Sequence, residues 1–193
     1  MKTARLEAFS DGVFAIIITI MVLEIKTPSG NSFYNLLELL PTLVSYILSF
    51  IFIGIYWVNH HHLFQAIKTV STKILWSNLN LLFWLSLVPV ATEWLGHSNF
   101  AVASVVTYGV LLLICGGSAT IQIQSLHASD HEIIDLKAIL DKSLIKVYIS
   151  ITSYLLGITL AFYDTRITIA IYFLAMLIWV IPNREIERKM RNK

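Results

Sequence analysis

Charged residues are scarce in this chain of 193 residues. Only 13% of the residues are charged and 56% are hydrophobic, whereas soluble domains carry about 25% charged residues. The mean hydropathy is +0.73. A soluble chain of this length would have to bury too much apolar surface, so the composition predicts an integral membrane protein with a single domain over residues 1–193. The net charge of +2 is too small to indicate a nucleic-acid partner.

Cysteine and the motifs of common active sites are also nearly absent. The single cysteine, Cys115, excludes a disulfide framework or a cysteine-based metal cluster within one chain. The sequence has no nucleophile elbow, P-loop or dinucleotide fingerprint, and it lacks the TVGYG filter of pore-loop potassium channels. His60, His61 and His62 are adjacent, so on a helix they point in different directions and form no common metal-binding face. These absences make an enzyme the least expected class, and we expect no cofactor or metal.

Long apolar runs are what the sequence has in abundance. Six apolar segments lie at about residues 8–25, 39–60, 74–95, 100–123, 144–163 and 167–182. They predict an all-α membrane protein with six transmembrane helices, and Pro89 is expected to kink the third. The stretch "SDHEIIDLKAILDK" before the fifth segment has helical apolar spacing. It is expected to lie at the membrane interface as an amphipathic helix or to extend a neighbouring helix.

Basic residues are divided unequally between the two sides of this predicted topology. Of the 14 Lys and Arg residues, only Lys26 and Arg166 fall on one side, and the other 12 fall on the opposite side with both termini. Because basic loops stay in the cytoplasm, we expect a multi-pass protein of the inner (plasma) membrane with both termini cytoplasmic.

The first apolar segment, "RLEAFSDGVFAIIITIMVLEIK", carries a carboxylate near each end. Only 12 residues, Gly12 to Leu23, separate Asp11 from Glu24, whereas a spanning helix needs roughly 20 mostly apolar residues. The segment is therefore expected to span the membrane with Asp11 inside it or near its surface. Asp11 is then either an anchor at the helix N-terminus or an interior group with a partner on another helix.

One face of this segment carries Ile16, Thr19, Ile20 and Leu23, spaced i, i+3, i+4 and i+7. From the spacing alone, such a stripe is typical of helix packing or lipid contact. The Thr19 hydroxyl can satisfy itself by bonding back to a carbonyl of its own helix.

Polar residues cluster at the cytoplasmic end of the second segment, "GIYWVNHHHLF". We expect Trp57 and one or two of the histidines to donate hydrogen bonds into the bundle near Arg5, Ser10 and Asp11. The third segment adds two further amides, Asn78 and Asn80. Elsewhere His127 and His131 have i, i+4 spacing, which allows a metal site but is more typical of a solvated loop or an interfacial helix.

Three stretches resemble one known family. The stretch "RLEAFSDGVFAIIITIMVLEI" resembles the R-x-x-x-F-S-D signature and apolar first helix of the transmembrane protein 175 family, which comprises lysosomal and endosomal potassium channels in animals and short bacterial homologues. "YWVNHHHLF" and "NLNLLFWLSLVPVAT" extend the match. The resemblance is specific over about residues 5–95, and its length and number of segments fit a bacterial member with a single six-helix unit.

This resemblance implies a potassium-selective channel of modest selectivity without a pore-loop filter. In such a channel the first helices of a homotetramer line a central pore in the lipid bilayer, and potassium ions are the permeant species. The positions that match the family's constriction are Ile16 and Leu23. Thr19 matches a position that offers a ring of hydroxyls between them, and Ile20 is expected to reach the lumen because the stripe is broad.

The resemblance also implies a structural or gating network around the signature motif. Its members are expected to be Arg5, Phe9, Ser10, Asp11, Trp57, His60 and Asn80. Glu24 follows the stripe at the external end of the first helix. There it either concentrates cations at the pore mouth or is simply a solvated helix end.

A transporter is the alternative that the residues leave open. Asp11 and the His60–His62 cluster could relay protons in a proton-coupled transporter or in a proton-conducting pore. Inverted repeats and interrupted helices, which many transporters show, are not visible in the sequence. A membrane enzyme is the weakest alternative.

Overall fold

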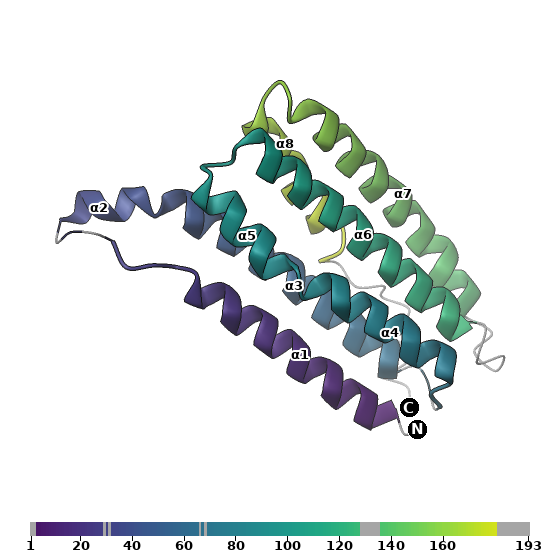
Figure 1. Ribbon diagram of the computed structural model, residues 1–193. Helices are drawn as coiled ribbons and strands as arrows, with labels where there is room; N and C mark the ends of the chain where they lie inside the picture. Colours follow the sequence, from purple (N-terminus) through teal and green to yellow (C-terminus); the bar gives the residue numbers. More distant parts are fainter. Residues whose placement is uncertain are drawn as a thin grey trace.

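The computed structural model describes residues 3–28, 30, 32–65, 67, 69–127 and 136–180, with the backbone alone for 127 and 136–144. Its elements are α-helices joined by short turns (Figure 1). The helices are α1 (Thr3–Leu23), α2 (Phe33–Glu38), α3 (Leu40–Gln65), α4 (Thr72–Leu85), α5 (Val88–His97), α6 (Val102–His127), α7 (Leu136–Leu160) and α8 (Thr165–Leu177). The prediction of an all-α membrane protein is confirmed.

The long helices form a bundle in which α1 lies along one edge. Figure 1 shows α4 and α5 in front of α3, with α6 next to them and α7 and α8 on the side away from α1. Among the described residues, four helical stretches are long and apolar enough to cross a membrane, namely Thr3–Leu23, Leu40–Gln65, Thr72–His97 (α4 and α5 together) and Val102–Leu126. The apolar helices that match the last two predicted segments, Ile145–Leu160 and Thr165–Leu177, are shorter.

The third predicted segment is broken where proline requires it. α4 ends at Leu85 and α5 starts at Val88, with Pro89 in the first turn of α5. Because proline has no N–H and its ring crowds the preceding turn, it is tolerated at this position but not in a helix interior. The Ser86 hydroxyl donates to the carbonyl oxygen of Phe83 at 2.7 Å and satisfies one acceptor near the break. The expected kink is therefore a short interruption between two helices.

The starts of α2 and α7 add to what the sequence predicted. α2 was not predicted; it begins with a capping box in which Ser32 accepts from the Tyr34 N–H and the Asn35 side chain accepts from the Ser32 N–H. In Figure 1, α2 projects from the bundle as a continuation of α3. The described part of the amphipathic stretch extends α7, which starts at Leu136, so one of the two expected placements applies there.

The core contains a close contact between α6, α7 and α8. Tyr172 of α8 is fully buried, and its hydroxyl donates to the Val105 carbonyl oxygen at 3.4 Å. A Cβ atom added at Gly109 or at Gly157 would overlap the Tyr172 ring. Glycine at these two positions therefore makes room for the tyrosine between α6 and α7.

Substituting Gly157 by alanine should destabilise the protein because the new methyl group collides with the Tyr172 ring. Overpacking of this kind costs about 1–3 kcal/mol, which thermal unfolding in detergent would detect as a lower midpoint. Gly117→Ala on α6 is the matched control, because a Cβ there meets no atom within 4 Å. Equal midpoints for the two variants would show that Tyr172 can move aside at no cost.

Candidate pore-lining helix and its polar joints

α1 has two distinct faces. One face packs against α3, α4 and α5 through buried side chains, namely Leu6, Ser10, Phe14, Ile17 and Met21. The opposite face carries the stripe identified in the sequence, and no described part of the chain covers it. Ile16 is 58% exposed, Ile20 41% and Leu23 77%, and Thr19 is exposed as well. The edge position of α1 in Figure 1 explains this exposure.

The Thr19 hydroxyl is oriented by its own helix. It donates to the Ile16 carbonyl oxygen at 2.9 Å, the back-bonding that the sequence allowed. Because its only proton is used, the oxygen offers acceptor lone pairs to whatever faces the exposed stripe. Glu24 follows the last helical residue and is half-buried.

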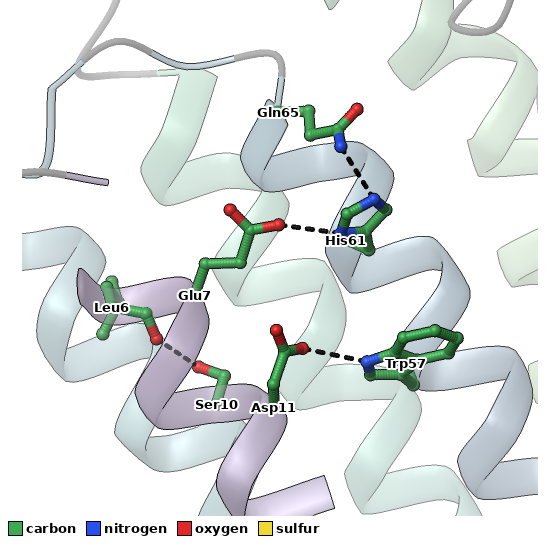
Figure 2. Close-up of polar contacts among 7 residues, drawn as sticks. All are labelled: Leu6, Glu7, Ser10, Asp11, Trp57, His61 and Gln65. Carbon is green, nitrogen blue, oxygen red and sulfur yellow. Dashed lines mark hydrogen bonds and ion pairs between the residues drawn. The ribbon is translucent and has the colours of Figure 1, made fainter. Parts of the chain in front are cut away.

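An outer polar joint connects the N-terminal half of α1 to α3 (Figure 2). The Trp57 indole donates to Asp11 Oδ1 at 2.9 Å, and His61 Nδ1 lies 2.7 Å from Glu7 Oε1. Gln65 Nε2 donates to His61 Nε2 at 2.7 Å, so the His61 proton is on Nδ1, facing Glu7. Glu7 lies one turn before Asp11 on α1, and His61 lies one turn after Trp57 on α3, as two antiparallel neighbouring helices require.

An inner polar joint lies beside the outer one and is buried. The Ser10 hydroxyl donates to the Leu6 carbonyl oxygen at 2.9 Å and accepts from Asn78 Nδ2 at 3.0 Å. Asn78 Oδ1 accepts from Gln122 Nε2 and lies 2.8 Å from His60 Nε2. Four helices, α1, α3, α4 and α6, therefore meet at one amide.

The inner joint fixes the tautomer of His60. Because Asn78 Oδ1 can only accept, His60 Nε2 carries the proton. His60 Nδ1 is buried and has no hydrogen-bond partner among the described residues. The ring stacks on Phe64 at 4.3 Å between centroids and meets the edge of Phe14 at 5.5 Å. This environment suits a neutral imidazole that holds helices together.

Asp11 has a partner on another helix, which is one of the two readings that the sequence left open. Other residues of the expected network lie elsewhere. Arg5 and Phe9 are exposed on α1, and Arg5 makes no hydrogen bond or ion pair with any described residue. Asn80 makes no side-chain hydrogen bond within the described residues either. Asn78, not Asn80, contributes the amide of the joint.

Three residues of the joints, Glu7, Gln65 and Gln122, were not identified from the sequence. His61 was named only as part of the His60–His62 cluster, and Asn78 only as a further amide of the third segment. The i, i+4 spacing of Glu7 with Asp11, and of Trp57 with His61, is a signal that sequence reasoning could have used. Gln122 stands out as an amide near the end of an apolar run.

Metal ligands do not gather in the part of the chain that the structure describes. Within it, no three His, Cys, Asp or Glu side chains are placed to hold a metal ion together. The His127–His131 pair lies outside the described side chains.

Comparison with known proteins agrees with this architecture. Residues 5–89 match the family model described as "Endosomal/lysosomal potassium channel TMEM175". A potassium channel of Chryseobacterium sp. (strain P1-3) is 51% identical over 191 residues, which cover 99% of each chain. The chain belongs to the TMEM175 family. It is therefore a member of a membrane-embedded ion-channel family and not of an enzyme family.

A crystal structure and more distant relatives extend this assignment. The structure of a TMEM175 homologue from Chamaesiphon minutus, described as a lysosomal potassium-selective channel, superposes with a TM-score of 0.78 at 27% identity. The match covers 92% of this chain and 96% of that one. TMEM175 of Gallus gallus, named an endosomal/lysosomal proton channel, is 35% identical over 48% of this chain and 21% of its own length. The family includes members named for potassium and members named for protons.

Proposed function

We propose that this TMEM175-family chain forms a potassium-selective cation channel as a homotetramer, with α1 from each of four copies around a central pathway. The observation that carries the proposal is the uncovered stripe of Ile16, Thr19, Ile20 and Leu23 on the edge helix. One chain encloses no pathway with this stripe, whereas a ring of four copies places it around an axis. The potassium-channel names of the bacterial relatives support the choice of ion.

The chemistry of the stripe suits a constriction of modest selectivity. Isoleucine and leucine side chains offer no oxygen atoms to replace the hydration shell of an ion, so ions pass partly hydrated or the ring dewets and closes. Potassium releases water more easily than sodium, which favours potassium at such a ring. Four Thr19 oxygens, with lone pairs free to accept, would add polar contacts between the Ile16 and Leu23 rings.

For the membrane topology of this channel we propose the arrangement that the sequence predicts. We propose six crossings, in which α4 and α5 together make the third and α7 and α8 make the last two. Both termini then face the cytoplasm, and the protein lies in the bacterial inner membrane. The uneven split of basic residues supports this orientation. The polar joints then lie at the cytoplasmic half of the pore helix and hold it against the bundle. Glu24 lies at the external mouth.

A second candidate function is proton conduction, because the animal relatives are named proton channels. The Glu7–His61 pair and Asp11 line the accessible side of α1 and α3, and both groups can exchange protons. His60 is a poor relay, since its Nε2 proton is held by Asn78 and its Nδ1 atom has no partner among the described residues.

Flux from liposomes tests the proposal directly. Purified protein in vesicles loaded with potassium and diluted into sodium should release potassium, which a pH-sensitive dye reports when a protonophore balances the charge. Reversing the two cations should give a slower signal. Protein-free vesicles are the control. Transport that requires a proton gradient or a second substrate would contradict a channel and favour a proton-coupled transporter. A signal without the protonophore would identify protons as permeant.

A further inference from the structure

One flank of the bundle carries a ridge of large side chains that the described residues leave exposed. The ridge lies on α4 and consists of Trp76 (69% exposed), Leu79 (42%) and Phe83 (57%), with the half-buried Asn80 beside them. Their i, i+3, i+4 and i+7 spacing places them on one side of the helix. In Figure 1, α4 forms part of the front of the bundle, next to α1.

The other flank carries a groove of suitable size for one of these rings. The groove has a volume of about 210 Å³ and is apolar. It is lined by Ile51, Gly54, Ile55 and Val58 of α3 and by Trp179 and Val180 after α8. An apolar cavity of about 150 Å³ can hold a benzene molecule, so the groove accommodates the phenyl ring of Phe83. In Figure 1, α3 lies behind α4 and α5, so the helix that lines the groove and the helix that carries the ridge lie on different sides of the bundle.

The ridge and the groove lie at the same height along the bundle. Trp57 bonds to Asp11 and Asn78 bonds to Ser10, so these pairs give common reference levels on α1. With a rise of about 1.5 Å per residue, Phe83 lies roughly 7 Å from the Asn78 level, toward the Leu23 end of α1. The centre of the groove lies roughly 4 Å from the Trp57 level in the same direction. The groove is measured from the Asp11 level, which is one residue beyond the Ser10 level used for Phe83. With this offset, the heights of Phe83 and of the groove centre agree within about 2 Å.

Asn80 favours a protein surface over lipid as the cover of the ridge. Its carboxamide has no hydrogen-bond partner within the described residues and lies in a helix that is apolar enough to span the membrane. Acyl chains offer neither donors nor acceptors, so exposure to lipid leaves both ends of the amide unsatisfied. A protein surface can supply a donor or an acceptor to such an amide, which acyl chains cannot.

We propose that the α4 ridge of one copy docks into the α3–α8 groove of the next copy, with the Phe83 ring in the groove. A closed ring needs two different complementary patches on each chain, one on each flank of the axis-facing edge. A rotation about an axis along α1 keeps every residue at its height, so the matched levels let the contact repeat around the ring. This inference rests on the proposed four-fold channel.

Oxidative cross-linking in membranes tests the contact. Phe83→Cys combined with Ile55→Cys, in a Cys115→Ser background, should form disulfides between copies and give bands of two, three and four chains. Each single cysteine variant should stay monomeric on a denaturing gel, because a heterologous contact never brings identical positions together. Phe83→Cys with Leu155→Cys is the matched control, since Leu155 is exposed on α7, away from the ridge and groove.

Filling the groove provides a second, independent test. A Cβ at Gly54 meets no atom within 4 Å, so Gly54→Leu should leave the fold intact while its side chain occupies the groove. Native mass spectrometry in mild detergent should then show tetramer affinity weakened by about tenfold or more, as when a buried aromatic anchor is lost. Gly117→Leu on α6 is the control, because Gly117 is equally open, and it should leave the tetramer unchanged.

The outcomes separate this inference from the channel proposal. A tetramer that carries potassium flux but gives no bands with the 83–55 pair would overturn the docking contact and leave the channel standing, with lipid or another surface on the ridge. Cross-linked bands of two chains, without bands of three or four, would overturn the closed ring. A monomer that carries no potassium flux would overturn the channel proposal and the docking together.

Discussion

Replacing Ile16 by asparagine is expected to raise the potassium flux and to lower the preference for potassium over sodium. The residue is 58% exposed on the stripe that we place around the pore. An amide at this position supplies polar atoms that keep water in the constriction, so sodium no longer has to lose as much hydration. If the apolar ring contributes about 1.4 kcal/mol of discrimination, the permeability ratio falls by about tenfold. Bilayer recordings with potassium on one side and sodium on the other would measure the ratio as a reversal potential.

Two further variants locate the filter along α1. Leu23→Ala widens the other apolar ring and should also increase conductance and reduce selectivity. Ile16→Val keeps the position apolar and should retain most of the selectivity, which makes it the control for any change in helix packing. Unchanged reversal potentials in both Ile16→Asn and Leu23→Ala would place the filter outside α1.

Replacing Asn78 by leucine is expected to be the most destabilising of the substitutions considered. Asn78 is fully buried, and its carboxamide contacts Ser10, Gln122 and His60 in the inner polar joint. Leucine removes the acceptor for two buried N–H groups, which then have no partner. Hydrogen bonds within membranes are modest, but orphaned buried donors are costly, so we expect a loss of about 2–4 kcal/mol. Thermal unfolding in detergent, followed by tryptophan fluorescence, would report it.

The neighbouring glutamines of α6 supply a graded comparison for this loss. Gln122→Leu removes one bond of the inner joint and leaves the His60–Asn78 bond in place, so it should cost less than Asn78→Leu. Gln124→Leu is the control, since Gln124 is exposed and should tolerate an apolar side chain facing lipid. Equal midpoints for Asn78→Leu and Gln124→Leu would mean that the joint adds nothing to stability.

The positions of the helices could be predicted because lipid constrains the sequence strongly. Every backbone N–H and C=O group within the bilayer must be hydrogen-bonded, so the spanning segments appear in the sequence as long apolar runs. Pro89 marks the interruption in the third segment. α2 was missed because its apolar residues do not stand out from the run that follows. Its start is encoded in the short capping box of Ser32 and Asn35 instead.

The joints were harder to predict because they depend on which helix faces which. Asn78 and Asn80 are chemically identical and two residues apart, yet on a helix they point about 200° away from each other. Sequence alone does not say which of the two faces the bundle, and the structure selects Asn78. The Trp57–Asp11 contact was expected from the polar cluster and from the family resemblance. The Glu7–His61 pair follows from the antiparallel register of α1 and α3, which only the packing defines.

The shortness of the uncharged part of α1 has an electrical consequence for the proposed pore. Between Asp11 and Glu24 the helix contains 12 uncharged residues, which at 1.5 Å per residue span about 18 Å, against a hydrocarbon core of about 30 Å. Water that enters from both ends to the level of these carboxylates would leave only this section to insulate one side from the other. Nearly the whole membrane voltage then falls across the stripe, so each permeating charge gains about 2.3 kcal/mol per 100 mV over a few helical turns.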